Sequence, residues 1–242
     1  MNSAFFILEP VQFKNICKIY PPKVRDIAIN DNAIQFIKLL TVSQEELIDP
    51  LVLEDKPIDD VLTPFETLLN LAYNTPQLQI LIKEAIHFFT HEECLILPTE
   101  KMILIGNIQN ATDLRHLKFL TEDNYFEFQN MIREACGNKP KEPFDFNIHP
   151  WKLRMDAKAR YRDKIKAKKS GLSFNYLMLS ICCMGIGITP LNIGELSYAA
   201  LGPLMATYQN KEKYEIDIDS LLAGADAKKI KPEYWIKNLT DE

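Results

Sequence analysis

Residues 76–106 decide the fold class, because the stretch PQLQILIKEAIHFFTHEECLILPTEKMILIG changes its hydrophobic period halfway. Its first half, from Pro76 to Thr90, is typical of a helix with a proline in the first turn. Its second half has two short apolar runs on either side of Pro98, which indicates a β-hairpin over residues 94–105. We therefore expect helices that pack on a small hairpin.

Helical patterns surround this stretch, and a different pattern opens the chain. Residues 5–20 are rich in aromatic and β-branched side chains and are interrupted by proline, which favours one or two short strands or an extended arm. The acidic, proline-punctuated residues 49–60 are expected to form a loop. Helices are predicted over residues 24–40, 58–73, 121–137, 152–169, 173–186 and 190–208, with short ones beginning at Ser43 and carrying Trp235. The predicted fold class is therefore α+β and predominantly α-helical.

The proline-rich residues 138–150 mark the main boundary of the chain, because they contain three prolines and no hydrophobic period. We predict an N-terminal α-rich domain with short strands, including the small β-hairpin, over residues 1–138. We predict a C-terminal helical domain over residues 171–242. Residues 139–170 are predicted to form the proline-rich boundary and a basic linker helix.

The composition is that of a folded protein in a reducing compartment. Hydrophobic residues make up 47% of the chain and charged residues 25%, which excludes disorder throughout. The five cysteines are odd in number and lack the spacing of a secreted disulfide scaffold. We expect the adjacent Cys182 and Cys183 in the core. The apolar residues 174–188 are fewer than the roughly 20 that cross a membrane, and the N-terminus does not look like a signal peptide.

Few residues are arranged for chemistry, and none forms a catalytic motif. His87 and His91 are four residues apart and Cys94 follows, so two imidazoles and a thiolate offer a metal-binding alternative. The pattern supplies no fourth ligand and the adjacent phenylalanines favour packing, so we predict no metal. The glycines around Gly187 lack the spacing and the lysine of a phosphate-binding loop. We therefore predict that the protein is not an enzyme and holds no cofactor.

The basic residues 152–169 are the strongest local signal in the chain. Nine Lys or Arg residues outnumber two Asp residues there, a local charge of +7 in a chain whose net charge is −5. Three interpretations fit this pattern: a solvated connector, an arm that binds nucleic acid or an acidic protein, and docking on the acidic remainder of the same chain. We predict an exposed helix that binds a partner protein through Lys158, Arg160, Arg162, Lys166 and Lys169.

The C-terminal half also carries a resemblance. Its most specific pieces follow the basic segment and are ITPLNIGELSYAAL at residues 188–201 and SLLAGADAKKIKPEYWIKNL at residues 220–239. The start of the chain, FFILEPVQFKNICKIYPPKVRDI at residues 5–27, fits the same group more loosely. In this order of features the chain resembles accessory proteins encoded among the tail genes of phages of Gram-positive bacteria. These are similar in layout to tail assembly chaperones and baseplate hub accessory proteins.

The resemblance implies a function by protein contact. It implies a phage tail assembly or baseplate-associated protein, either a chaperone or a structural accessory, with tail proteins such as the tape measure or the baseplate hub as partners. It places the protein in the host cytoplasm during virion assembly, with the virion tail as a second location, and implies no membrane. The alternative is a nucleic-acid-binding protein that uses the basic helix 152–169.

Overall fold

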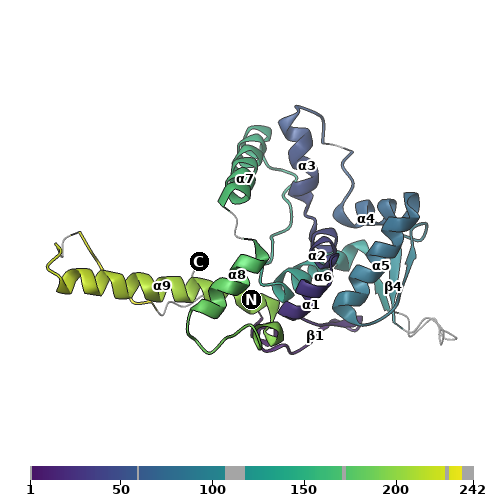
Figure 1. Cartoon of the computed structure of the whole chain (residues 1–242). Helices are drawn as coiled ribbons and strands as arrows, with labels where there is room; N and C mark the ends of the chain where they lie inside the picture. The colour runs from purple at the N-terminus through teal and green to yellow at the C-terminus, as the bar shows by residue number, and fades with distance from the viewer. Residues whose placement is uncertain (1, 59, 107–117, 171–172, 227–228, 236–242) are drawn as a thin grey trace.

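The computed structural model describes residues 2–58, 60–106, 118–170, 173–226 and 229–235, apart from the side chains of residues 167–170. Helices make up most of the described chain, and two small sheets accompany them (Figure 1). The predicted class, α+β and predominantly α-helical, is confirmed. No helix in the described part is long and apolar enough to cross a membrane.

The body of the molecule contains the helices that precede residue 136. They are α1 (Val24–Ile29), α2 (Ala33–Thr41), α3 (Gln44–Leu53), α4 (Pro64–Asn74), α5 (Pro76–Thr90) and α6 (Glu122–Ala135). The pattern predicts one helix over residues 24–40, but the chain turns between α1 and α2. At this turn the side chain of Asn30 accepts a hydrogen bond from the backbone of Asn32, a local bond that competes with the helix.

Two predicted boundaries near α3 and α4 are wrong. α3 continues through Pro50 to Leu53, so the loop expected over residues 49–60 begins later. Pro50 removes one backbone hydrogen bond from the helix. The burial of Ile48 and Asp49 beside it offsets the free energy lost with that bond. α4 begins at Pro64 instead of residue 58, because the hydroxyl of Thr63 caps it and accepts a hydrogen bond from the backbone of Glu66.

The two sheets are antiparallel. The first pairs β1 (Val11–Phe13) with β2 (Cys17–Ile19), which confirms short strands within residues 5–20, and a 3-10 helix, η1 (Ser3–Ile7), precedes it. The second pairs β3 (Cys94–Leu97) with β4 (Met102–Ile105), which confirms the predicted hairpin. A third strand that the sequence pattern missed, β5 (Lys118–Leu120), pairs with β4.

One apolar core joins the β1-β2 pair, the β3-β4-β5 sheet and helices α2, α4, α5 and α6. Aromatic rings meet inside it, and the ring centroids of Phe13 and Phe128 are 5.6 Å apart. Those of Phe65 and Tyr125 are 5.0 Å apart. The core therefore lies on the sheet side of the molecule, where Figure 1 shows α5 beside β4.

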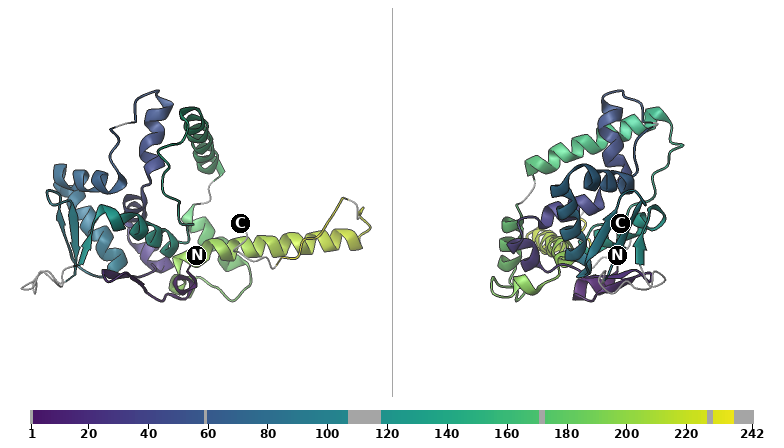
Figure 2. Two further views of the ribbon diagram at one scale, coloured as in Figure 1. Left: turned by 180° about the vertical axis from the view of Figure 1, so that it is seen from behind. Right: turned by 90° about the vertical axis from the view of Figure 1, so that its right-hand side faces the viewer.

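The chain after residue 149 forms the remaining helices. They are α7 (Pro150–Ser170), α8 (Phe174–Cys183), the 3-10 helix η4 (Ile193–Glu195) and α9 (Tyr198–Leu222). α9 starts later and runs further than the helix predicted over residues 190–208. Its buried residues, Ala199 and Leu201, lie in its first turn, and Figures 1 and 2 show its far part projecting from the body. The segment 229–235 has no helix, so the short helix expected around Trp235 is absent from the described part of the chain.

α8 is less buried than expected. Ile181 is its buried residue, whereas Tyr176 and Leu179 are each more than half exposed. Cys182 is half-buried and Cys183 is exposed, so the expectation that both lie in the core is wrong. The reason is that α8 packs by one face on a small second core of Val24, Ile193 and Leu201, which leaves its other face open.

Elements from both sides of the predicted domain boundary pack together. The hydroxyl of Ser197 donates to the carbonyl of Phe5 over 2.6 Å, and Ala199 belongs to the main core. Gly137 makes this approach close: it has a φ of +78°, and a Cβ there would stand 2.8 Å from the carbonyl oxygen of Ala199. The predicted division into domains at residues 138 and 171 is not tested by these contacts and stays a prediction.

Candidate functional site: the two faces of helix α7

The inner face of α7 packs on α3. It is formed by Leu153, Ala157, Arg160 and Lys164, whose spacing of four, three and four residues places them along one side of a helix. Leu153 is 4% exposed and Ala157 is fully buried. Figure 1 shows α3 and α7 side by side, apart from the sheet.

Ion pairs complete this contact, and they run antiparallel along the two helices. They join Arg154 to Asp55, Arg160 to Asp49 and Lys164 to Glu46. The most buried of them is that of Arg160, whose Nε and Nη2 donate to the two carboxylate oxygens of Asp49 over 2.9 and 2.6 Å. The hydrogen bond with Asp49 also raises the pKa of Arg160 above its ordinary value. Because Asp49 is only 7% exposed, this two-pronged pair is the main polar anchor of α7.

The outer face of α7 has no partner of this kind among the described residues. It is formed by Trp151, Met155, Lys158 and Arg162, again at spacings of four, three and four residues, on the side away from α3. Trp151 is 68% exposed and Met155 45%. Lys158 and Arg162 are exposed, and Nε of Arg162 donates to the carbonyl oxygen of Lys158.

The predicted partner-binding residues divide between these faces. Lys158 and Arg162 lie on the outer face, and Lys166 follows at the same spacing and is exposed. Arg160 lies on the inner face, where Asp49 holds it within the chain. The side chain of Lys169 lies outside the described residues. Their role in binding a partner stays a prediction, and docking within the chain, the third interpretation of the basic segment, applies to the inner face.

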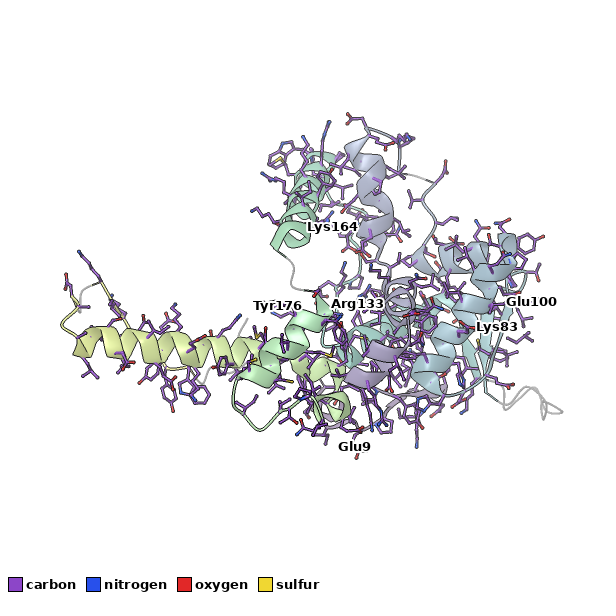
Figure 3. All side chains as sticks on the ribbon, in the orientation of Figure 1. Glu9, Lys83, Glu100, Arg133, Lys164 and Tyr176 are labelled. Carbon is purple, nitrogen blue, oxygen red and sulfur yellow. The ribbon has the colours of Figure 1, made fainter. Side chains whose placement is uncertain are left out.

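A basic cavity of about 990 Å³ lies between α7 and the body. Its walls come from α2, α3, the end of α6, the following segment and α7, and its lining residues are Lys38, Thr41, Val42, Glu46, Arg133, Asn138, Lys139, Lys141, Tyr161, Lys164 and Ile165. Figure 3 shows Arg133 in the body and Lys164 on the facing helix α7. The sequence pattern did not find this site, because its cations come from four separate segments.

Arg133 is the buried member of this cavity, with 4% exposure. Its Nη1 donates to Oδ1 of Asn130 over 2.9 Å, and its Nη2 donates to the carbonyl oxygen of Thr41 at the end of α2. Burial lowers the pKa of the guanidinium, and the carboxylates of Glu46 and Glu45 act against that shift. Arg133 therefore caps α2 and holds a positive charge at the cavity wall.

Lys141 connects the same region to the start of α3. Its Nζ donates to Oγ of Ser43 over 2.7 Å and lies 3.7 Å from Oε2 of Glu45. Burial raises the pKa of Glu45, but the hydrogen bonds from Ser43 and its own backbone and the charges of Lys141 and Arg160 outweigh it. The pKa of Glu45 is therefore lowered. The carboxylate stays ionised and fixes Lys141 near the cavity.

The histidine and cysteine alternative finds little geometric support. Nδ1 of His87 lies 3.2 Å from the carbonyl oxygen of Glu92, and the ring of His91 stacks on Tyr20 with centroids 4.0 Å apart. Cys94 is buried in β3, where burial raises the pKa of its thiol to about 12. Within the described residues, no three His, Cys, Asp or Glu side chains are placed to hold a metal ion together. The predicted absence of a metal stays a prediction.

Comparisons with protein-family models, with curated proteins and with solved structures found no match to this chain. Within the described residues, the two faces of α7 and the cavity beneath it are the features with a geometry suited to binding.

Proposed function

We propose that this chain is an interaction protein that binds an acidic partner protein through the outer face of α7 and acts by contact, not by catalysis. The observation that carries the proposal is that Trp151, Met155, Lys158 and Arg162 share one exposed side of a helix whose opposite side is fixed on α3. Tryptophan, methionine and arginine are enriched at protein interfaces, and tryptophan and arginine often dominate the binding energy.

The charge pattern favours an acidic protein over nucleic acid. Three cations of the basic segment, Arg154, Arg160 and Lys164, are already paired with carboxylates of α3 or of the residues directly after it. The rest of the chain is acidic, so an extended polyanion that runs beyond α7 meets repulsion. A small acidic patch on a partner protein can bind the outer face of α7 without approaching the acidic remainder of this chain.

The resemblance gives the class of partner. On that basis we propose a role in phage tail assembly or at the baseplate, as a chaperone or a structural accessory, with the tape measure or the baseplate hub as partner. The site of action proposed is the host cytoplasm during virion assembly, with the virion tail as a second location. The phage role is inferred from the resemblance of residues 5–27, 188–201 and 220–239. Partner binding by the outer face of α7 is inferred from the structure and does not depend on that resemblance.

The test is binding of the purified chain to the tape measure and baseplate hub proteins of the phage class that the resemblance implies. Reversing both outer-face charges, Lys158→Glu and Arg162→Glu together, is expected to weaken binding about tenfold or more at 0.15 M salt. Trp151→Ala is expected to weaken it about 30-fold, from a loss of about 2 kcal/mol. The control Lys213→Glu changes an exposed lysine on α9 in the same way and is expected to leave affinity unchanged.

Two results contradict the proposal. If the control and the outer-face variants bind the partner with equal affinity, the outer face of α7 is not part of the interface. Binding of the wild-type chain to duplex DNA or RNA at 0.15 M salt, lost in the outer-face variant while tail proteins still bind, makes the nucleic-acid alternative correct.

A further inference from the structure

We propose that the basic cavity between α7 and the body binds a small anion that carries a chain of phosphates. This site is separate from the outer face of α7, so the inference does not depend on the proposed function. Its lining contains five cationic side chains and one carboxylate, that of Glu46. A compact anion with several charges is the ligand that such a lining attracts.

The cavity is built by the fold and is not a loose surface cluster. Lys38 comes from α2, Arg133 from α6, Lys141 from the segment after α6, and Lys164 from α7. These positions span more than 120 residues of sequence, so the fold brings them together: α2 packs on α6, and α7 adds Lys164 from the opposite side. The guanidinium of Arg133 is held by Asn130 and Thr41 at a position fixed before any ligand arrives.

The buried guanidinium of Arg133 also favours an anion in the cavity. The two groups that accept its hydrogen bonds, the amide oxygen of Asn130 and the backbone carbonyl of Thr41, are both neutral. A buried cation costs free energy unless an opposite charge compensates it. Glu46 and Glu45 supply negative charge near Arg133, but Glu46 is 3.8 Å from Lys164 and Glu45 is 3.7 Å from Lys141, so each carboxylate is shared with a lysine. We therefore expect an anion in the cavity to gain more from Arg133 than it would from a single exposed lysine.

The size and walls of the cavity narrow the class of ligand. A volume of about 990 Å³ lies at the upper end of the range for small-molecule sites, so one phosphate leaves most of it empty. Arginine and lysine are the side chains that bind phosphates, the first through paired donors and the second as a point charge. Tyr161 and Ile165 add an apolar wall that accommodates a group attached to the phosphates. Inorganic polyphosphate and a nucleoside triphosphate share this chemistry.

The experiment is isothermal titration calorimetry of the full chain with inorganic tripolyphosphate and, separately, with adenosine triphosphate. We expect both to bind one site per chain. Lys38→Glu, on an exposed position of α2, and Lys164→Glu, on α7, are each expected to weaken binding by about tenfold or more. The control Lys158→Glu changes the outer face of the same helix and is expected to bind both anions as the wild type does.

The two probes separate the sources of the anion. Equal affinities support recognition of the phosphate chain alone, and tighter binding of the nucleotide that Tyr161→Ala abolishes supports a contact with the attached group. Because Lys164→Glu also removes a link to Glu46, Lys38→Glu tests the site without touching the α3–α7 contact. The proposal is overturned if neither anion binds, or if Lys38→Glu and Lys158→Glu bind alike. It is also overturned if a single-stranded DNA oligonucleotide binds while tripolyphosphate does not.

Discussion

The main core and the contact between α3 and α7 hold the same chain together by different forces. In the core, Phe89 and Phe128 are fully buried among other apolar side chains. In the α3–α7 contact, two buried side chains of α7, Leu153 and Ala157, are flanked by ion pairs that remain partly open to water. Apolar burial responds little to salt, whereas open ion pairs are screened by it. We therefore expect a change of charge in the α3–α7 contact to release α7 while the core persists.

The largest expected effect breaks the core. Phe128→Ala removes a ring that contacts Phe13 and Tyr125 in the middle of the protein. We expect a loss of about 3–5 kcal/mol in the free energy of unfolding, because the cavity left behind adds to the lost burial. Urea unfolding followed by circular dichroism measures it. A loss below about 1 kcal/mol at low and high salt alike would place the main core elsewhere.

A smaller effect tests the α3–α7 contact. Asp49→Ala, Arg160→Ala and the double variant form a cycle around the two-pronged pair. We expect a coupling free energy of about 1–2 kcal/mol at low salt, because the carboxylate is nearly buried while the guanidinium is partly exposed. Urea unfolding of the four proteins gives this value, and 1 M salt is expected to reduce it. Coupling indistinguishable from zero at low salt means that Leu153 and Ala157 alone hold α7.

The smallest effect is a pH dependence at the edge of the core. Burial, followed by the charge of His87, lowers the pKa of His91 below its ordinary value. The unfolded chain then binds the proton more tightly, so the stability that His91 contributes is fully present above about pH 6.5 and is lost as the pH falls below that value through the lower pKa of the folded chain. His91→Asn keeps a residue that tolerates the positive φ of this position and removes the titrating ring. Urea unfolding between pH 7.5 and 5.5 is expected to show a smaller loss of the free energy of unfolding in this variant than in the wild type. If both proteins lose the same free energy over this range, His91 is not the source of the pH dependence.

Much of the core was predictable because its signals are local. Pro76 and the apolar spacing after it define α5, and two short apolar runs around Pro98 define the β3-β4 hairpin. β5 was not predictable, since a strand of three residues gains its identity from pairing with β4. The prediction that Cys183 lies in the core was wrong for a related reason. An apolar sequence does not show which face of α8 packs against a neighbouring element.

The candidate site was predictable in its charge and not in its geometry. The basic segment marks α7, but the assignment of Arg160 to the inner face depends on where Asp49 lies in α3. The cavity escaped the sequence pattern altogether, because Lys38 and Lys141 are unremarkable alone. One signal was present: Arg133 sits on the buried side of α6, where a cation needs a structural or binding reason.

Hydrogen–deuterium exchange of the α7 backbone amides tests most directly whether its two faces are independent. We compare the wild type, Arg160→Glu on the inner face, and Lys158→Glu with Arg162→Glu on the outer face. The reversal at Arg160 places a carboxylate beside Asp49, so α7 amides are expected to exchange about tenfold faster or more while those of α5 keep their protection. The outer-face variant is expected to exchange at the wild-type rate throughout α7. Equal acceleration in both variants, or loss of protection in α5 together with α7, contradicts the division of this helix into a docking face and a binding face.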